Sequence, residues 1–254
     1  MLLAIDVGNT NITLGLYKDN VLRVTARLST DINRTQDQYA IEIKNILSLH
    51  SVSPEEIEDA IVSTVVPPVG ATVSRAVALL CHIVPFELGP GVKTGLNIKI
   101  DNPAQLGADL VAAAVGALNE YTTPCIVIDM GTATTISVID KNGAMIGGAI
   151  TAGVSLTLKA LTQNTSLLPS VNIDAPPSPI GRNTVDCIKA GLIYGTAAML
   201  DGYIERIEEQ LGCSATVVAT GGLSREIIAH CRHSIIYNEN LLLDGLRIIY
   251  EKNN

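Results

Sequence analysis

Two short segments of the chain carry an aspartate, a glycine and small polar side chains in the same order. The first reads DVGNTN from residue 6 and the second reads DMGT from residue 129, and each follows an apolar run. Glycine permits a tight turn in which main-chain N–H groups approach an anion closely. Asn and Thr add neutral donors, and an aspartate at a strand end can bind Mg²⁺ together with water and phosphate oxygens. The pattern therefore indicates phosphate binding.

A single Asp-x-Gly turn can also be an Asx-type turn that binds no ligand. Duplication argues against that explanation, since three pairs of residues match between the copies: Asp6 with Asp129, Gly8 with Gly131, and Asn9 with Thr132. A third turn, ATGGLS at 219–224, follows another apolar run, and paired glycines let adenine and ribose lie against bare backbone. The sequence has no Walker-type Gly-x-x-x-x-Gly-Lys motif, so a P-loop enzyme is not expected.

The segments around the two turns repeat as well. Each turn reads as the tip of a β-hairpin with a buried first strand, followed by a helix and then a strand that ends in a turn. These segments are 2–17, 37–50 and 60–68 in the first half, and 125–140, 191–211 and 215–224 in the second. The repeat predicts an α/β fold of two stacked domains related by internal duplication, with a cleft between them. The expected domains are 1–118 and 119–254, because NEYTTP at 119–124 interrupts a helical stretch.

Composition excludes several classes of function. Of 254 residues 47% are hydrophobic, the net charge is −8, and no basic run occurs, so neither nucleic acid nor an anionic membrane is an expected partner. No apolar run is long enough to span a bilayer, and the start of the chain does not resemble a secretory signal. The five scattered cysteines fit reduced thiols, which predicts a cytoplasmic protein.

Taken together, the acidic hairpin tip, its copy and the Gly-Gly turn resemble the acetate and sugar kinase, Hsp70 and actin superfamily, whose two domains are ribonuclease H-like. The segment 87–118 is more specific. It contains Gly-Pro-Gly, Thr-Gly, Asn-Pro and Gly-Ala-Asp in that order, and it is similar to the substrate segment of the type III pantothenate kinases. The resemblance covers most of the chain and also includes STDINRTQDQY (29–39), STVVPP (63–68) and GGAITAGVSLTLKAL (147–161).

The resemblance implies a kinase that transfers the γ-phosphate of ATP to pantothenate, giving 4′-phosphopantothenate in the first step of coenzyme A synthesis. The implied ATP-binding residues are Asp6, Val7, Gly8, Asn9, Thr10, Asn11, Ile12, Thr13 and Thr132. The implied pantothenate-binding residues are Gly107, Ala108, Asp109, Leu110 and Thr184. Asp6 would serve Mg²⁺, Asp129 would bind an activating monovalent cation (K⁺ or NH₄⁺), and the protein would be a homodimer.

The resemblance also makes Asp109 the general base. Phosphoryl transfer to an alcohol needs a carboxylate that orients the hydroxyl and accepts its proton, which agrees with this role. The alternative is that Asp109 only caps the helix that follows it. At a helix start the dipole is expected to keep the carboxylate ionised.

One residue departs from the family pattern. Leu110 follows Gly-Ala-Asp where the family usually has Arg, so the chain lacks a guanidinium beside the expected position of the pantothenate carboxylate. Lys93, Lys99 or Arg182 would then have to replace that charge. Two other functions stay open: a regulatory or accessory protein of the same fold, and a kinase for another small alcohol. The presence of Asp6, Asp109 and Asp129 favours catalysis, because a sensor does not need a general base.

Overall fold

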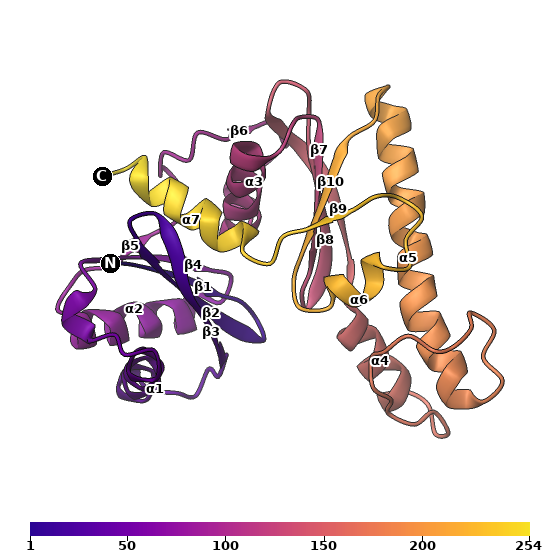
Figure 1. Cartoon of the computed structure of the whole chain (residues 1–254), viewed down its shortest axis with the longest axis horizontal. Coiled ribbons are helices and arrows are strands. Elements are labelled where there is room, and N and C mark those ends of the chain that lie inside the picture. The colour runs from indigo at the N-terminus through magenta and orange to yellow at the C-terminus, as the bar shows by residue number, and fades with distance from the viewer. The chain divides into compact units, whose positions relative to one another are not determined.

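The protein is described by a computed structural model that covers residues 1–254 and divides into two compact units (Figure 1). Unit 1 consists of Met1–Leu96, Asp101–Asn119 and Asn240–Asn254. Unit 2 consists of Asn97–Ile100 and Glu120–Glu239. Each unit is built on one mixed sheet with helices packed on it.

Unit 1 contains a five-stranded sheet in the order β3-β2-β1-β4-β5. Its strands are β1 (Leu2–Val7), β2 (Asn11–Lys18), β3 (Val21–Ser29), β4 (Asp59–Thr64) and β5 (Phe86–Glu87). The hairpins β1–β2 and β2–β3 are antiparallel, whereas β4 runs parallel to β1 and β5 runs parallel to β4. The central strand β1 is buried along most of its length, which explains its nearly continuous apolar sequence.

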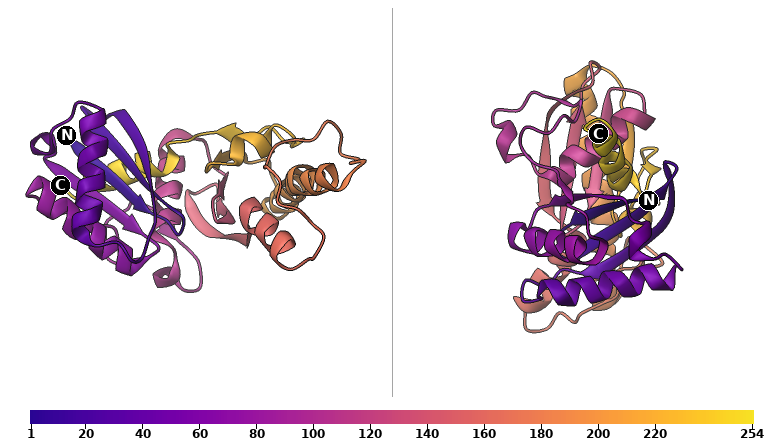
Figure 2. Two further views of the ribbon diagram at one scale, coloured as in Figure 1. Left: turned by 90° about the horizontal axis from the view of Figure 1, so that it is seen from below. Right: turned by 90° about the vertical axis from the view of Figure 1, so that its left-hand side faces the viewer.

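Two helices cover one face of this sheet, as Figure 2 shows. Helix α1 (Gln36–Leu49) begins with a capping box on Thr35, and α2 (Pro67–Cys81) begins with two prolines, which suit the first turn of a helix. Their apolar faces form one core with the residues of β1, β2 and β4 that point the same way. A short 3₁₀ helix (Pro54–Glu56) precedes β4.

The opposite face of the unit 1 sheet carries α7 (Leu241–Glu251), and α7 in turn packs on α3 (Ala108–Glu120). Leu243 of α7 lies against Gly15 of β2, where a Cβ would be only 3.0 Å from it. Where α7 and α3 cross, a Cβ on Gly245 would lie 1.8 Å from the carbonyl oxygen of Ala112. Gly245 therefore allows the backbones of α7 and α3 to come into contact. Because of this packing, the last helix of the chain is part of unit 1.

Unit 2 contains a six-stranded sheet in the order β11-β10-β7-β8-β9-β6. Its strands are β6 (Asn97–Ile98), β7 (Cys125–Met130), β8 (Ala133–Ile139), β9 (Ala144–Ala152), β10 (Thr216–Thr220) and β11 (Ile236–Tyr237). Strands β7, β8 and β9 form antiparallel hairpins, while β10 runs parallel to β7 and β11 runs parallel to β10. Apart from the added edge strand β6, this is the strand order and direction of unit 1, as the internal repeat predicts.

Three helices, α4 (Val154–Gln163), α5 (Thr184–Leu211) and α6 (Ser224–Ile228), pack on one face of the unit 2 sheet. The even-numbered residues of β7, from Ile126 to Met130, point into this core. Asp129 therefore points to the other face. Helix α5 begins seven residues before the predicted start at 191, because Asn183 caps it by accepting a hydrogen bond from the Asp186 N–H.

The predicted α/β class with two duplicated, ribonuclease H-like sheets is confirmed. The packing units differ from the predicted ranges 1–118 and 119–254 at three places, since α7 belongs to unit 1, Asn97–Ile100 belongs to unit 2, and Asn119 belongs to unit 1. The second exchange follows from pairing, because β6 lies parallel to β9. None of the helices is both long enough and apolar enough to cross a membrane.

Candidate active site

The β1–β2 turn of unit 1 has its carbonyl groups tied back toward the protein. The Gly8 N–H donates to the Asn11 carbonyl at 3.0 Å, while Thr30, just after β3, donates its hydroxyl to the Gly8 carbonyl at 2.7 Å and its N–H to the Thr10 carbonyl at 3.0 Å. Asn9 and Thr10 are exposed at the tip. Because these three carbonyls are occupied and the polar side chains of Asn9 and Thr10 are exposed, the turn has the character of an anion-binding site.

The other residues of the predicted phosphate segment 6–13 divide by face. Val7 and Ile12 are fully buried in the unit 1 core, so they can meet a ligand only through their backbone. Asp6 and Thr13 form a cross-strand pair on the opposite face, the face that α7 covers. The side chains that could touch a nucleotide are therefore Asp6, Thr13 and the polar residues of the tip.

Asp6 accepts a hydrogen bond from a residue to which the sequence motifs assign no role. Ser63 of β4 is its direct neighbour in the parallel β1–β4 register, and the Ser63 hydroxyl donates to Asp6 Oδ1 at 2.9 Å. Ser63 is fully buried, with 0% of its surface exposed. Because the hydroxyl fixes one carboxylate oxygen, it sets the plane in which the Asp6 carboxylate lies.

The β7–β8 turn of unit 2 repeats the first turn in tighter form. The Gly131 N–H donates to the Ala133 carbonyl at 3.0 Å, and the Gly153 N–H donates to the Thr132 carbonyl at 3.1 Å. Gly153 lies so close that a Cβ there would be 2.4 Å from the Gly131 carbonyl oxygen. Thr132 is exposed at the tip, where a ligand could reach it.

The structure brings Asp129 and the predicted adenosine turn together within unit 2. Asp129 is paired with Thr220 of β10, and a Cβ on Gly221 would lie 2.8 Å from Asp129 Oδ1. Gly221 also has a φ of +98°, a backbone conformation that L side chains rarely adopt. Both the closeness and the backbone angle explain why the Thr-Gly-Gly turn needs glycine at this position.

Both aspartates fit the cations that the sequence implies. No group of three or more His, Cys, Asp or Glu side chains is arranged to hold a metal ion, but Mg²⁺ commonly uses one or two carboxylates with waters and phosphate oxygens, and Asp6 supplies one. Asp129 faces Thr135 across the hairpin, and the Thr135 hydroxyl oxygen is buried without a hydrogen-bond partner in the chain. A carboxylate beside an unsatisfied hydroxyl suits a cation that prefers oxygen ligands.

Asp109 lies in the first turn of α3 and is half-buried. Its Oδ1 accepts a hydrogen bond from the Leu110 N–H at 2.8 Å, and a Cβ on Gly107 would lie 2.3 Å from the same oxygen. Burial raises the pKa of the Asp109 carboxyl, and the Leu110 N–H lowers that pKa by a smaller amount. Desolvation makes Asp109 a stronger base than an ordinary aspartate.

The predicted residues fall into two groups. Asp6 and the segment Gly107–Leu110 lie in unit 1, where α7 packs on both the Asp6 face of the sheet and on α3. Asp129, Thr132 and Thr184 lie in unit 2, with Thr184 exposed at the first position of α5. Of the three replacement cations considered for Leu110, only Lys93 lies in the same unit as Leu110.

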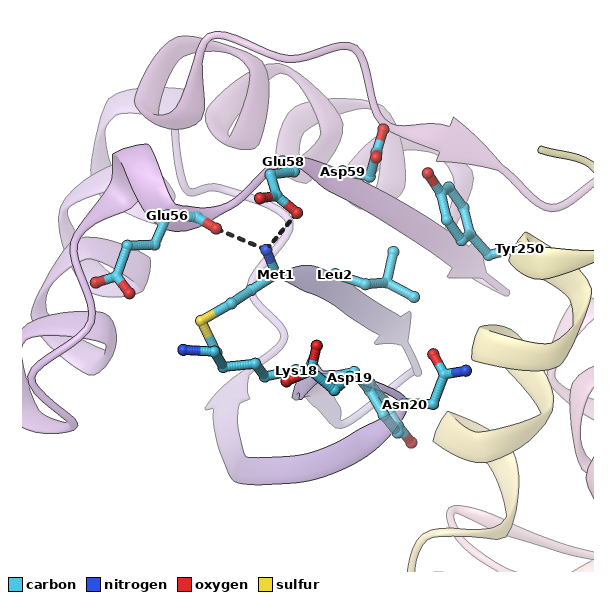
Figure 3. A pocket seen from close by; sticks show the side chains of 10 residues that line it. Met1, Leu2, Lys18, Asp19, Asn20, Glu56, Glu58, Asp59 and Tyr250 are labelled. Carbon is cyan, nitrogen blue, oxygen red and sulfur yellow. Dashed lines mark hydrogen bonds and ion pairs between the residues drawn. The ribbon is translucent and has the colours of Figure 1, made fainter.

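The pocket drawn in Figure 3 contains none of the predicted residues. It has a volume of about 370 Å³ and lies in unit 1 at the start of β1, the end of that strand away from Asp6. There the Met1 amine donates to the Glu58 carboxylate at 2.9 Å and to the Glu56 carbonyl at 2.8 Å. Its lining carries four carboxylates, Asp19, Glu56, Glu58 and Asp59, so it is a poor site for a triphosphate.

Comparison with known proteins points in the same direction as the motifs. The family model described as "Type III pantothenate kinase" matches residues 2–206. A curated relative from Exiguobacterium sibiricum with the same description is 43% identical over 253 residues, which are 100% of this chain and 100% of the relative.

Two solved structures show the fold alone, because both are under 25% identical. A Baf family transcriptional activator from Campylobacter jejuni has a TM-score of 0.60 at 22% identity, covering 99% of this chain and 98% of that one. An inorganic polyphosphate/ATP-glucomannokinase from an Arthrobacter strain has a TM-score of 0.51 at 16% identity, covering 99% and 98%.

Proposed function

Because the chain belongs to the type III pantothenate kinase family, we propose that it transfers the γ-phosphate of ATP to the hydroxyl of pantothenate, which gives ADP and 4′-phosphopantothenate, in the first step of coenzyme A synthesis. The observation that carries the proposal is the match to the family over 253 residues, with Asp6, Asp109 and Asp129 all present. The five unpaired cysteines fit a reaction in the cytoplasm.

The phosphates of ATP bind the exposed donors of the β1–β2 turn and Thr132 of the β7–β8 turn. The Thr-Gly-Gly turn receives the adenosine, since its glycines leave the backbone bare. Asp6 would hold Mg²⁺, which would neutralise charge on the phosphate oxygens when bound. The hydrogen bonds that engage the turn carbonyls, donated by Thr30 in the first turn and by Gly153 in the second, support these roles.

Asp109 accepts the proton of the pantothenate hydroxyl as the oxygen of that hydroxyl forms its bond to the γ-phosphorus and the bond to the ADP oxygen breaks. The raised pKa of the Asp109 carboxyl supports this role, because a buried carboxylate holds the proton more strongly than one in water. Gly107, Ala108, Leu110 and Thr184 complete the proposed pantothenate site.

The substrate is tested by a coupled ADP-release assay with pantothenate and a panel of related primary alcohols. We expect ADP release to depend on pantothenate and to be strongest with it. Release with another alcohol but not with pantothenate would show a kinase of different specificity. Tight binding of ATP and pantothenate without any ADP release would instead favour the regulatory alternative.

Leu110→Arg should change the Michaelis constant for pantothenate by less than about fivefold. A charge-assisted Arg–carboxylate contact is worth about 1.5 to 3 kcal/mol, or roughly 10- to 100-fold in affinity, if the site lacks a cation. We expect a smaller effect because the rest of the substrate segment matches the family, so that another cation, Lys93, Lys99 or Arg182, already meets the carboxylate. Steady-state kinetics at saturating ATP measure the change.

Ala variants of the three cations serve as the matched comparison for Leu110→Arg. One of them should raise the Michaelis constant for pantothenate in the native background and be rescued by Leu110→Arg. An improvement well above fivefold on introducing Arg alone would show that the native pocket lacks a positive charge.

The protein should form a homodimer at micromolar concentration. Two helices, α3 and α5, carry Ala- and Gly-rich segments that could pack closely against a partner, and the segment in α3 is buried within unit 1 against α7. The one in α5 is different, because Gly191, Gly195 and Ala198 lie exposed on one side of the helix. Leu167 and Ile180, in the segment before α5, are 90% and 78% exposed. These apolar surfaces support a partner contact on unit 2.

Light scattering measures the molar mass, and hence the oligomeric state, of the wild-type protein and of the Gly195→Gln variant. A Cβ on Gly195 would have no neighbour within 4 Å, so the variant should fold and, as a helix-interior Gly replacement, gain stability. We expect a dimeric mass for the wild type and a shift toward monomer for the variant. A monomeric wild type across the micromolar range would refute the dimer.

A further inference from the structure

In each sheet the key aspartate lies between two hydroxyl side chains on neighbouring strands. In unit 1 the row runs Thr13, Asp6, Ser63, and in unit 2 it runs Thr135, Asp129, Thr220. Residues that are directly opposite on adjacent strands point to the same face, so each row forms one polar line across its sheet. The internal duplication thus includes the neighbours of the two aspartates as well as the turns.

Within the unit 1 row, Ser63 and Asp6 are joined by a defined contact. The Ser63 hydroxyl donates to Asp6 Oδ1 at 2.9 Å, and Ser63 is fully buried in β4, a strand whose flanking residues Ile61 and Val62 are also buried. Neither partner can swing away freely, because both strands are fixed by the β1–β4 ladder. The Ser63 hydroxyl is neutral, so it orients the Asp6 carboxylate without neutralising the charge that would attract a cation.

We propose that Ser63 is a positioning residue for Asp6, which sets the orientation in which that carboxylate meets Mg²⁺ bound to the ATP phosphates. The inference rests on the proposed role of Asp6. A carboxylate rotates about a broad torsion, so each hydrogen bond to Asp6 narrows the range of orientations that its carboxylate populates. A buried hydroxyl bonded to one oxygen removes that freedom before the ligand arrives, as a second layer of contacts does for metal ligands in general.

The test is isothermal titration of ATP into the full-length protein, once with Mg²⁺ and once with EDTA, for wild type and Ser63→Ala. Because a hydrogen bond to a charged group contributes substantially to binding, Ser63→Ala should weaken the affinity for ATP in the presence of Mg²⁺ by about tenfold. Binding in EDTA should stay within about twofold of wild type, because the turn that holds the phosphates is untouched. In kinetics, the half-saturating Mg²⁺ concentration should rise while the pantothenate Michaelis constant does not.

Two further variants distinguish a role of the Ser63 hydroxyl in orienting Asp6 from a purely structural role in the core. Ser63→Thr keeps the hydroxyl and should restore Mg²⁺-dependent binding, whereas Ser63→Cys is nearly isosteric but a weak donor and should restore it only in part. Ser74→Ala is the matched control, since Ser74 is buried in unit 1 with a hydroxyl that has no partner in the chain. Its ATP binding should equal that of wild type under both conditions.

An equal loss of ATP binding with Mg²⁺ and with EDTA in Ser63→Ala would overturn the inference, as would unchanged binding in Mg²⁺. Thermal melting of each variant shows whether the fold is intact. The ATP titrations contain no pantothenate, so their result does not depend on the identity of the alcohol substrate. A wild-type protein that binds ATP with Mg²⁺ but fails to phosphorylate pantothenate in the kinetic assay would refute the proposed substrate alone. The Ser63 result would still decide the positioning role by itself.

Discussion

Asp109→Asn is expected to lower kcat by a factor of about 10² to 10⁴, the usual contribution of a positioned general base. Asn keeps the shape of the side chain, and its amide oxygen can still accept a hydrogen bond from the Leu110 N–H. The variant should therefore fold and bind both substrates. Steady-state kinetics with the coupled assay, together with titration of ATP and pantothenate, measure the loss of turnover separately from binding.

The same variant decides between the base and the helix-cap interpretation of Asp109. Asn caps a helix about as well as Asp, so a residue that only caps would keep near-normal turnover as Asn. Asp101→Asn is a suitable control, because Asp101 is an exposed aspartate of the same unit with no proposed role. Near wild-type turnover in Asp109→Asn would show that the base assignment is wrong.

The pH dependence of the wild-type rate also tests whether Asp109 is the general base. Burial raises the pKa of the Asp109 carboxyl above the ordinary value of about 4. Since the base must be ionised to accept a proton, kcat should fall as the pH drops through this raised pKa, at a higher pH than for an exposed aspartate. Asp109→Asn should lose that acid limb. Circular dichroism over the same pH range separates the titration from unfolding.

Asp129→Ala should remove the stimulation by K⁺ or NH₄⁺ and with it most of the activity. Losing a charged contact of about 1.5 to 3 kcal/mol corresponds to roughly 10- to 100-fold in rate. The basis is the position of Asp129, which is paired across the hairpin with Thr135, whose buried hydroxyl has no hydrogen-bond partner in the chain, and which lies against Gly221. Wild-type rates should rise with K⁺ when choline keeps the ionic strength constant.

Glu209→Ala is a matched control for Asp129→Ala, because Glu209 is an exposed acid on α5 in the same unit. It should keep the K⁺ dependence of the wild type. Full wild-type activity in sodium- and choline-only buffers, with no increase on adding K⁺ or NH₄⁺, would contradict the cation role of Asp129.

The sequence alone was enough for the features that depend on consecutive residues. The two Asp-x-Gly turns, the apolar strands before them and the Thr-Gly-Gly turn follow directly from local residue types, and the repeat of these features gave the two-sheet fold. The long helix α5 followed from its apolar spacing, although its start depends on the cap at Asn183, which lies outside the periodic stretch.

The contacts between distant parts of the chain could not be predicted in this way. Ser63 lies 57 residues from Asp6, and its role depends on the parallel β1–β4 register. Thr30 reaches the β1–β2 turn only because β3 ends beside that turn. Helix α7 joins unit 1 because Gly245 fits against α3, and an isolated glycine in a helical sequence does not name its partner. The pKa of Asp109 depends on burial, which likewise has no local signal.

The central claim is that this chain phosphorylates pantothenate with Asp109 as the base. The most direct test is to incubate wild type and Asp109→Asn with ATP, Mg²⁺, K⁺ and pantothenate, and to identify the product by tandem mass spectrometry and ³¹P NMR. We predict 4′-phosphopantothenate from the wild type, with the phosphate on the primary hydroxyl, and at most a trace from Asp109→Asn. The absence of this product from the wild type, or equal amounts from both proteins, would contradict the account.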